Sequence, residues 1–126
     1  NTVAILSPIS KEFKKVDTNS GTFFILINKI SRNQDGYELD LQIGNPNFAT
    51  YKGVEFLFNV GGKWDPEGVK SSEEWRKSLR GFEFKTGMTL NPGYWTQIPI
   101  VIPQVNIKDL EYIECSLKVN SVELKY

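Results

Sequence analysis

The sequence contains no histidine and only one cysteine among its 126 residues. Without histidine, the chain cannot form a Ser-His or Cys-His catalytic pair, or a zinc site with imidazole ligands. A single cysteine forms no disulfide within the chain, so cysteine usage does not indicate the redox compartment. Cys115 shares the apolar side of an alternating pattern with Ile113 and Leu117, which predicts a buried thiol and not a reactive one.

An excess of one charge and a long apolar run are also missing. The 15 basic and 15 acidic residues balance to a net charge of zero. Nucleic-acid-binding proteins and polybasic membrane-surface proteins have a basic excess, so we expect neither kind of partner. No apolar run approaches the ~20 residues of a membrane-spanning helix. Because the sequence begins with Asn1 and not with Met, we expect it to be a processed or excised piece of a longer chain.

The acidic residues do not form a pattern typical of a catalytic or metal site. The nearest pairs along the sequence are Asp65 with Glu67, Glu73 with Glu74, and Asp109 with Glu111. These pairs occur in predicted turns or in the first turn of a predicted helix, where acidic residues are common. A glycosidase needs two carboxylates about 5–9 Å apart across a cleft, and no aspartate spacing matches a calcium loop. We therefore predict a protein that is not an enzyme and has no cofactor or metal.

The sequence does contain a series of alternating apolar segments. Between residues 37 and 43, apolar side chains alternate with polar ones, which predicts a half-buried strand. The preceding Asp35-Gly36 pair is typical of a tight hairpin turn, and the apolar run at residues 22–30 is its predicted partner strand. A similar alternation at residues 54–60 predicts the next strand. In a later apolar run, Pro99 predicts an edge strand or a bulge, because proline cannot donate a ladder hydrogen bond.

One helix is predicted at residues 71–81. Ser71 and Glu74 form a capping box at its start, and Gly81 is placed to end it. Trp75 and Leu79 lie one turn apart on the same face of this helix. We expect that face to pack on a sheet or to close one end of the domain, and so to cover the second apolar side of the strand at residues 22–30.

These elements predict an all-β protein with an antiparallel β-sandwich of immunoglobulin-like or fibronectin-like architecture and one short helix. A partly open β-barrel is the alternative. Residues 1–20 have weak periodicity and are predicted to be an N-terminal lead-in segment, with residues 21–126 forming a single β-sandwich domain.

A family resemblance rests on the order of several motifs. They are Gly-Thr-Phe-Phe at 21–24, Asp-Gly-Tyr-Glu-Leu at 35–39, Ile-Gly-Asn-Pro at 43–46, Leu-Asn-Pro-Gly-Tyr-Trp at 90–95 and Asp-Leu-Glu-Tyr-Ile at 109–113. In this order, residues 10–126 resemble DUF3251, a family of uncharacterised bacterial lipoprotein domains. The resemblance implies an extracytoplasmic β-sandwich in the cell envelope, membrane-anchored through a lipid on an upstream segment, periplasmic or at the surface. It implies no known activity.

The first functional hypothesis is a non-enzymatic envelope module that binds a protein partner or has a structural role. Its predicted surface comprises Trp64, Trp75, Arg76, Arg80, Tyr94 and Trp95, because Trp, Tyr and Arg dominate binding hot spots. A simpler interpretation is that the tryptophans cover the core and that the arginines belong to a solvated helix face paired with neighbouring glutamates.

The alternative hypothesis is a module that binds glycans or cell-wall material. Trp64, Tyr94 or Trp95 would stack on sugar rings. Asp65, Asn91 or Gln97 would then form hydrogen bonds with sugar hydroxyls. A β-sandwich fold alone does not decide between the two hypotheses.

Overall fold

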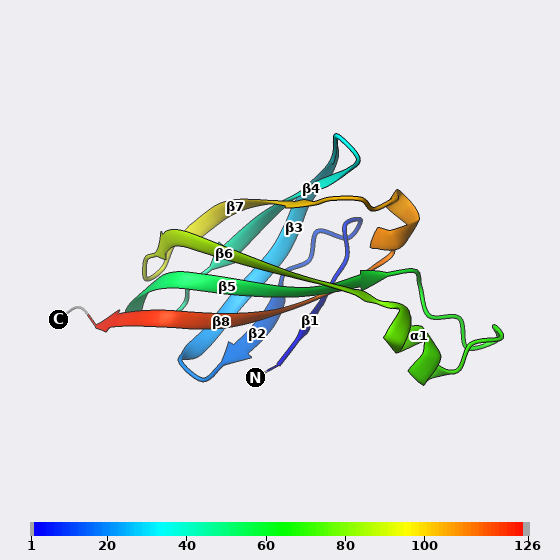
Figure 1. Ribbon diagram of the computed structural model, residues 1–126. Helices are drawn as coiled ribbons and strands as arrows, with labels where there is room; N and C mark the ends of the chain where they lie inside the picture. The colour runs from blue at the N-terminus through cyan, green and yellow to red at the C-terminus, as the bar shows by residue number, and fades with distance from the viewer. Residues whose placement is uncertain (1, 125–126) are drawn as a thin grey trace.

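The computed structural model describes residues 2–124 and contains two antiparallel sheets of four strands each, packed face to face (Figure 1). The first, sheet A, has the order β1 (Ala4–Leu6), β8 (Tyr112–Leu124), β5 (Ala49–Gly61) and β6 (Arg80–Leu90). The second, sheet B, has the order β2 (Lys14–Thr18), β3 (Gly21–Asn33), β4 (Gly36–Gly44) and β7 (Trp95–Ile102). The predicted sandwich is confirmed, and the partly open barrel does not form. The strand order differs from that of an immunoglobulin domain, whose first strand pairs with its second, because β1 pairs with β8.

The core lies between the two sheets and follows from the alternation of the strands. Sheet B contributes inward side chains such as Phe23, Leu39 and Ile43, and sheet A contributes Phe56 and Phe58, all fully buried. Successive strand residues point to opposite faces, so every second residue enters this layer. Cys115 is also fully buried, as predicted, and its burial raises the pKa of the thiol.

The hairpin between β3 and β4 forms where it was predicted, but its glycine has a different role. Asn33 pairs with Gly36, so Gln34 and Asp35 make the turn, and the positive φ of 50° falls on Gln34. A Cβ atom on Gly36 would lie 2.0 Å from the backbone oxygen of Ile102. Gly36 is therefore required by the close approach of the backbone that follows β7, and not by the turn.

The helix α1 (Ser72–Ser78) begins at its predicted cap, where the backbone N–H of Glu74 donates to Oγ of Ser71 at 3.2 Å. It ends at Leu79, before Gly81, which is already part of β6. The helix lies at the end of sheet A where β5 ends and β6 begins (Figure 1). The sequence predicted that this helix covers the outer side of β3, and that prediction is wrong. Strand β7 pairs only with β4, so Pro99 lies in an edge strand as predicted.

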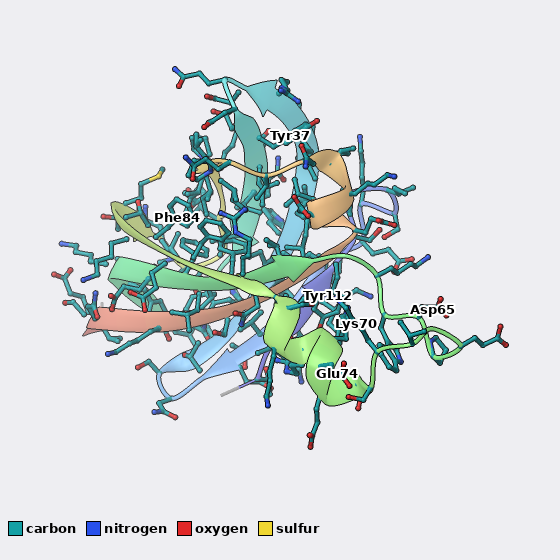
Figure 2. The ribbon with its side chains drawn as sticks, turned by 45° about the vertical axis from the view of Figure 1, so that its right-hand side comes forward. Tyr37, Asp65, Lys70, Glu74, Phe84 and Tyr112 are labelled. Atoms are coloured by element: carbon teal, nitrogen blue, oxygen red, sulfur yellow. The ribbon has the colours of Figure 1, made fainter. Side chains whose placement is uncertain are left out.

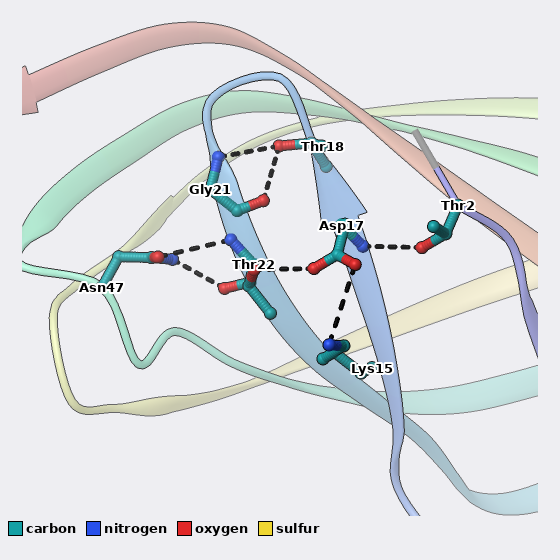
Figure 3. A network of polar contacts seen from close by, with 7 residues as sticks. All are labelled: Thr2, Lys15, Asp17, Thr18, Gly21, Thr22 and Asn47. Atoms are coloured by element: carbon teal, nitrogen blue, oxygen red, sulfur yellow. Dashed lines mark hydrogen bonds and ion pairs between the residues drawn. The ribbon is translucent and has the colours of Figure 1, made fainter.

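The predicted lead-in segment contributes an edge strand to each sheet, β1 and β2, within its described residues 2–20. Figure 3 shows the polar contacts that hold them. The backbone N–H of Asp17 donates to Oγ1 of Thr2 at 2.9 Å, and Oγ1 of Thr22 donates to Oδ1 of Asp17 at 2.7 Å. Nδ2 of Asn47 donates to the backbone oxygen of Thr22 at 2.7 Å. These bonds tie the segment before β1, the strands β2 and β3, and the β4–β5 connection together. Strands of three and five residues are too short to give a clear periodicity.

Candidate functional site

Trp64 and Trp75 form an aromatic cluster with Tyr112 at the α1 end of the sandwich. The ring centroids of Trp75 and Tyr112 are 4.8 Å apart in an edge-to-face arrangement, and those of Trp64 and Trp75 are 5.8 Å apart. Nε1 of Trp75 donates to the backbone oxygen of Gly62 at 2.8 Å. Figure 2 shows Tyr112 beside α1 and Asp65 on the projecting connection between β5 and α1. Both tryptophans are half-buried, and they attach this connection and the helix to the start of β8.

Arg76 lies on the same helix and forms an ion pair with a buried carboxylate. Its Nη2 donates to Oε2 of Glu114 at 2.8 Å, and Glu114 is only 2% exposed. Nδ2 of Asn59 donates to the same oxygen at 2.9 Å, while the hydroxyl of Tyr112 donates to Oε1 at 2.8 Å. Burial opposes ionisation of Glu114, but these hydrogen bonds outweigh it and hold the pKa of its carboxyl below the ordinary value. Burial, assisted by the bond to Glu114, raises the pKa of Tyr112.

Arg80 is also engaged within the molecule. Its Nη1 donates to the backbone oxygen of Gln104 at 2.5 Å, and its guanidinium lies 5.1 Å from the centre of the Phe82 ring. This arginine therefore joins the start of β6 to the connection after β7. Trp75, Arg76 and Arg80 make internal contacts at the α1 end. The arginines contact Glu114 and the backbone of Gln104, and not the neighbouring helix glutamates that the simpler interpretation expected.

A second group of aromatic side chains lies on the outer face of sheet B, at the opposite end of the sandwich. We call it the aromatic patch and define it as Phe13, Phe24, Tyr94 and Trp95. Phe24 pairs with Gly44 across β3 and β4, and Gly44 pairs with Trp95 across β4 and β7. Residues directly opposite one another in an antiparallel sheet point to the same face, so Phe24 and Trp95 flank a glycine that leaves room between them.

In the aromatic patch, the ring of Phe13 contacts those of Phe24 and Trp95. The ring centroids of Phe13 and Phe24 are 5.3 Å apart, and those of Phe13 and Trp95 are 6.0 Å apart. A Cβ atom on Gly44 would lie 3.2 Å from each of three atoms of the six-membered ring of Trp95, so the indole lies over the glycine. These side chains line a pocket of about 370 Å³ together with the β4–β5 connection.

The backbone beneath the aromatic patch is held by the buried side chain of Asn45. Its Nδ2 donates to the backbone oxygens of Ala49 at 2.9 Å and Leu90 at 3.0 Å. The backbone of Asn45 receives a bond from Gly93 at 2.7 Å and donates one to Tyr94 at 3.1 Å. The β6–β7 turn is therefore fixed to the β4–β5 connection, and this positions Tyr94 and Trp95.

The structure thus divides the predicted interaction residues into two groups. Trp64, Trp75, Arg76 and Arg80 lie at the α1 end, whereas Tyr94 and Trp95 belong to the aromatic patch. The sequence did not identify Phe13 and Phe24 as members of a surface. The sequence signal for Phe24 was that its strand is apolar on both sides, so its outer side needed a cover. In the structure Phe13 and Trp95 lie on that outer side, and α1 lies elsewhere.

The polar residues of the glycan hypothesis do not converge on one place. Oδ1 of Asp65 accepts the backbone N–H of Glu67 at 3.0 Å near α1, and Nε2 of Gln97 donates to Oδ1 of Asp40 at 2.8 Å on sheet B.

Within residues 2–124, no group of three or more His, Cys, Asp or Glu side chains is arranged to hold a metal ion. No helix in this described range is long and apolar enough to cross a bilayer.

Comparison with known proteins gives similarity in structure only, because no protein-family model and no curated protein sequence matches the chain. The chain is similar to the Salmonella enterica trimeric lipoprotein SadB, with a TM-score of 0.82 and 19% identity over 98% of this chain. It spans 64% of SadB. The uncharacterised lipoprotein yajI from Escherichia coli has a TM-score of 0.68 and 12% identity over 95% of this chain and 67% of its own.

A DUF1425 family member from Shewanella sp. pv-4 has 14% identity over 96% of each chain. Its TM-score of 0.38 is too low to support an argument about the fold. The first two structures share the fold of this chain, and both are lipoproteins. No match supports DUF3251 in particular, so that resemblance remains a prediction.

Proposed function

We propose that this chain is the extracytoplasmic domain of a bacterial envelope lipoprotein and that it binds a protein partner without catalysing a reaction. The observation that carries the proposal is the aromatic patch, in which Phe13, Tyr94 and Trp95 are exposed on a rigid sheet face. DUF3251 is the family in which such a domain would belong.

The exposure of the aromatic patch is unusual for a monomeric surface. Tyr94 is 67% exposed and Trp95 is 49% exposed, although both are large and apolar over most of their area. Clusters of exposed aromatic residues typically mark interaction sites, and Trp and Tyr are the side chains that contribute most to binding energy. The bonds of Asn45 hold the backbone of this surface before a partner arrives, which lowers the entropic cost of association.

The envelope location and the protein partner are supported by the structural comparison. SadB and yajI are lipoproteins, and SadB is described as trimeric. A protein that contains a domain of similar fold is therefore described as an assembly of subunits, which favours a protein as the partner of the aromatic patch.

Photo-crosslinking tests the proposed surface. Tyr94 is replaced by p-benzoylphenylalanine in the full-length protein in its native host, and Leu57, an exposed apolar residue on the outer face of sheet A, is replaced in the same way as a control. We expect a discrete crosslinked protein from position 94 and none from position 57. Equal products from both positions, or none from position 94, would refute docking through this face.

Membrane fractionation tests the envelope location independently. We expect the full-length native protein in the envelope fraction, with a lipid-modified cysteine at its mature N-terminus by mass spectrometry. An unmodified protein in the cytosolic fraction would contradict the envelope part of the proposal. It would not affect the crosslinking test of docking through the aromatic patch.

Glycan binding is a second candidate, favoured by one observation. The indole of Trp95 lies over Gly44 and lines a pocket with Tyr94, an arrangement in which an aromatic ring can stack against the apolar face of a sugar. Retention of the domain on peptidoglycan, lost in Trp95→Ala, would favour this function. Failure to bind peptidoglycan would remove it.

A further inference from the structure

A second apolar cavity, separate from the pocket that the aromatic patch lines, lies beside the β1–β2 connection. It has a volume of about 720 Å³ and is formed where the β1–β2 connection meets the 3-10 helix η1 (Ile107–Leu110) and the start of β8. Its walls are mainly aliphatic, and they include Ile5, Ile9, Ile30, Ile107, Leu110 and Tyr112. This size falls in the range of roughly 300–1,000 Å³ that is typical of small-molecule sites.

The apolar walls are accessible although they surround a cavity. Ile9 is 89% exposed, and Ile5 and Ile107 are each more than half exposed. The backbone at Ile107 is fixed by the capping box of η1, in which the backbone N–H of Asn106 donates to Oδ2 of Asp109 at 2.9 Å. The hydroxyl of Tyr112 donates to Glu114, so its polar atom is already used and its ring adds apolar surface.

Two lysines, Lys14 and Lys63, lie at the rim of this otherwise apolar cavity. Within residues 2–124, Lys63 has no carboxylate within ion-pair distance, whereas Lys14 has a 3.6 Å contact with Glu12. Glu111 also lines the cavity, so the lining side chains carry two positive charges and one negative charge. A ligand with an apolar body and one anionic group would complement both the walls and the rim.

We propose that this cavity binds an amphiphile with a long alkyl chain and an anionic head group, such as a long-chain carboxylate. The alkyl chain lies against the isoleucine walls, and the head group lies beside Lys63. This site shares no lining residue with the aromatic patch, although Lys14 directly follows Phe13 in the chain.

The test is a fluorescence titration of the folded protein with cis-parinaric acid, followed by displacement with unlabelled ligands. We expect saturable binding of one molecule, displaced by hexadecanoate more strongly than by hexadecanol. Each methylene removed from the competing carboxylate should weaken displacement about fourfold. Equal displacement by the acid and the alcohol would contradict the anionic head group, and the absence of saturable binding would overturn the site.

Matched variants locate the binding. Ile107→Ser should weaken binding about tenfold, and Lys63→Gln should weaken the carboxylate several-fold while leaving the alcohol unchanged. Leu57→Ser removes an equally exposed apolar side chain from sheet A, and Trp95→Ala alters only the aromatic patch; both should bind like the unmodified protein. Equal effects of Ile107→Ser and Leu57→Ser would overturn the assignment. If probe binding is lost as the protein concentration rises and dimers form, a second copy of the chain occupies the cavity. That result would also overturn the proposed ligand site.

Discussion

The indole of Trp95 lies over Gly44, the residue directly opposite it in the β4–β7 ladder. A side chain at position 44 would occupy the space that the ring now fills, since a Cβ atom there would be 3.2 Å from three ring atoms. The aromatic patch therefore depends on a glycine at the last position of β4. Glycine weakens a strand, and here the missing side chain makes room for a half-exposed tryptophan.

Gly44→Val should displace the Trp95 ring without unfolding the sandwich. The ring is at the surface and can move, so we expect a loss of stability of no more than about 2 kcal/mol. In a ¹H–¹⁵N spectrum, the indole N–H signal of Trp95 should shift, while those of Trp64 and Trp75 at the other end remain in place. An unchanged Trp95 signal would show that the ring does not lie over Gly44.

Arg76→Ala should destabilise the protein by about 2 kcal/mol, because it leaves the buried carboxylate of Glu114 without its charged partner. This value is below that of a fully buried pair, since Arg76 itself is exposed to solvent. Lys52→Ala breaks the exposed pair with Glu123 and should cost about 0.5 kcal/mol or less. Urea denaturation of both variants measures the difference. Equal losses would mean that Glu114 is effectively solvated.

Acid should destabilise the protein through Glu114. Because the folded-state pKa of this carboxyl is lowered, the carboxylate contributes stability above its unfolded pKa of about 4.3, and this contribution is lost as the pH falls through the folded-state pKa. In Glu114→Gln, the stability should therefore fall less steeply below about pH 4 than in the unmodified protein. Parallel pH profiles in urea denaturation would contradict the ion-pair network.

Cys115 should not react with thiol reagents in the folded protein. The side chain is fully buried and its burial raises the pKa of the thiol, so little thiolate is available to react. With 5,5′-dithiobis(2-nitrobenzoic acid), we expect no rapid reaction in buffer and complete reaction in denaturant. Stoichiometric labelling within the mixing time of the folded protein would show that sheet A opens readily around β8.

Features encoded by neighbouring residues could be predicted from the sequence. The cap of α1 needs only Ser71 and Glu74, the edge position of β7 needs only Pro99, and the β3–β4 hairpin follows from turn residues between two apolar runs. Each depends on backbone geometry within a few residues. The buried state of Cys115 likewise followed from the alternation along one strand.

Features that join distant residues could not be predicted. Glu114 occupies an outward position in β8 and looks like an ordinary surface residue. It is buried because Arg76 and Asn59 reach it from other elements. Gly36 is needed because the backbone of Ile102 approaches it, and Phe13 joins the aromatic patch only after β2 has paired with β3. Such contacts depend on strand order, which local patterns do not specify.

The measurement that tests docking through the aromatic patch most directly is the crosslinking yield from p-benzoylphenylalanine at position 94 in cells. The yield should fall at least fivefold in Trp95→Ala, which removes the ring of Trp95, and in Gly44→Val, which displaces the ring from its position over residue 44. It should be unchanged in the control Leu57→Ser. If Trp95→Ala and Leu57→Ser give the same yield as the unmodified protein, the aromatic patch is not the docking surface.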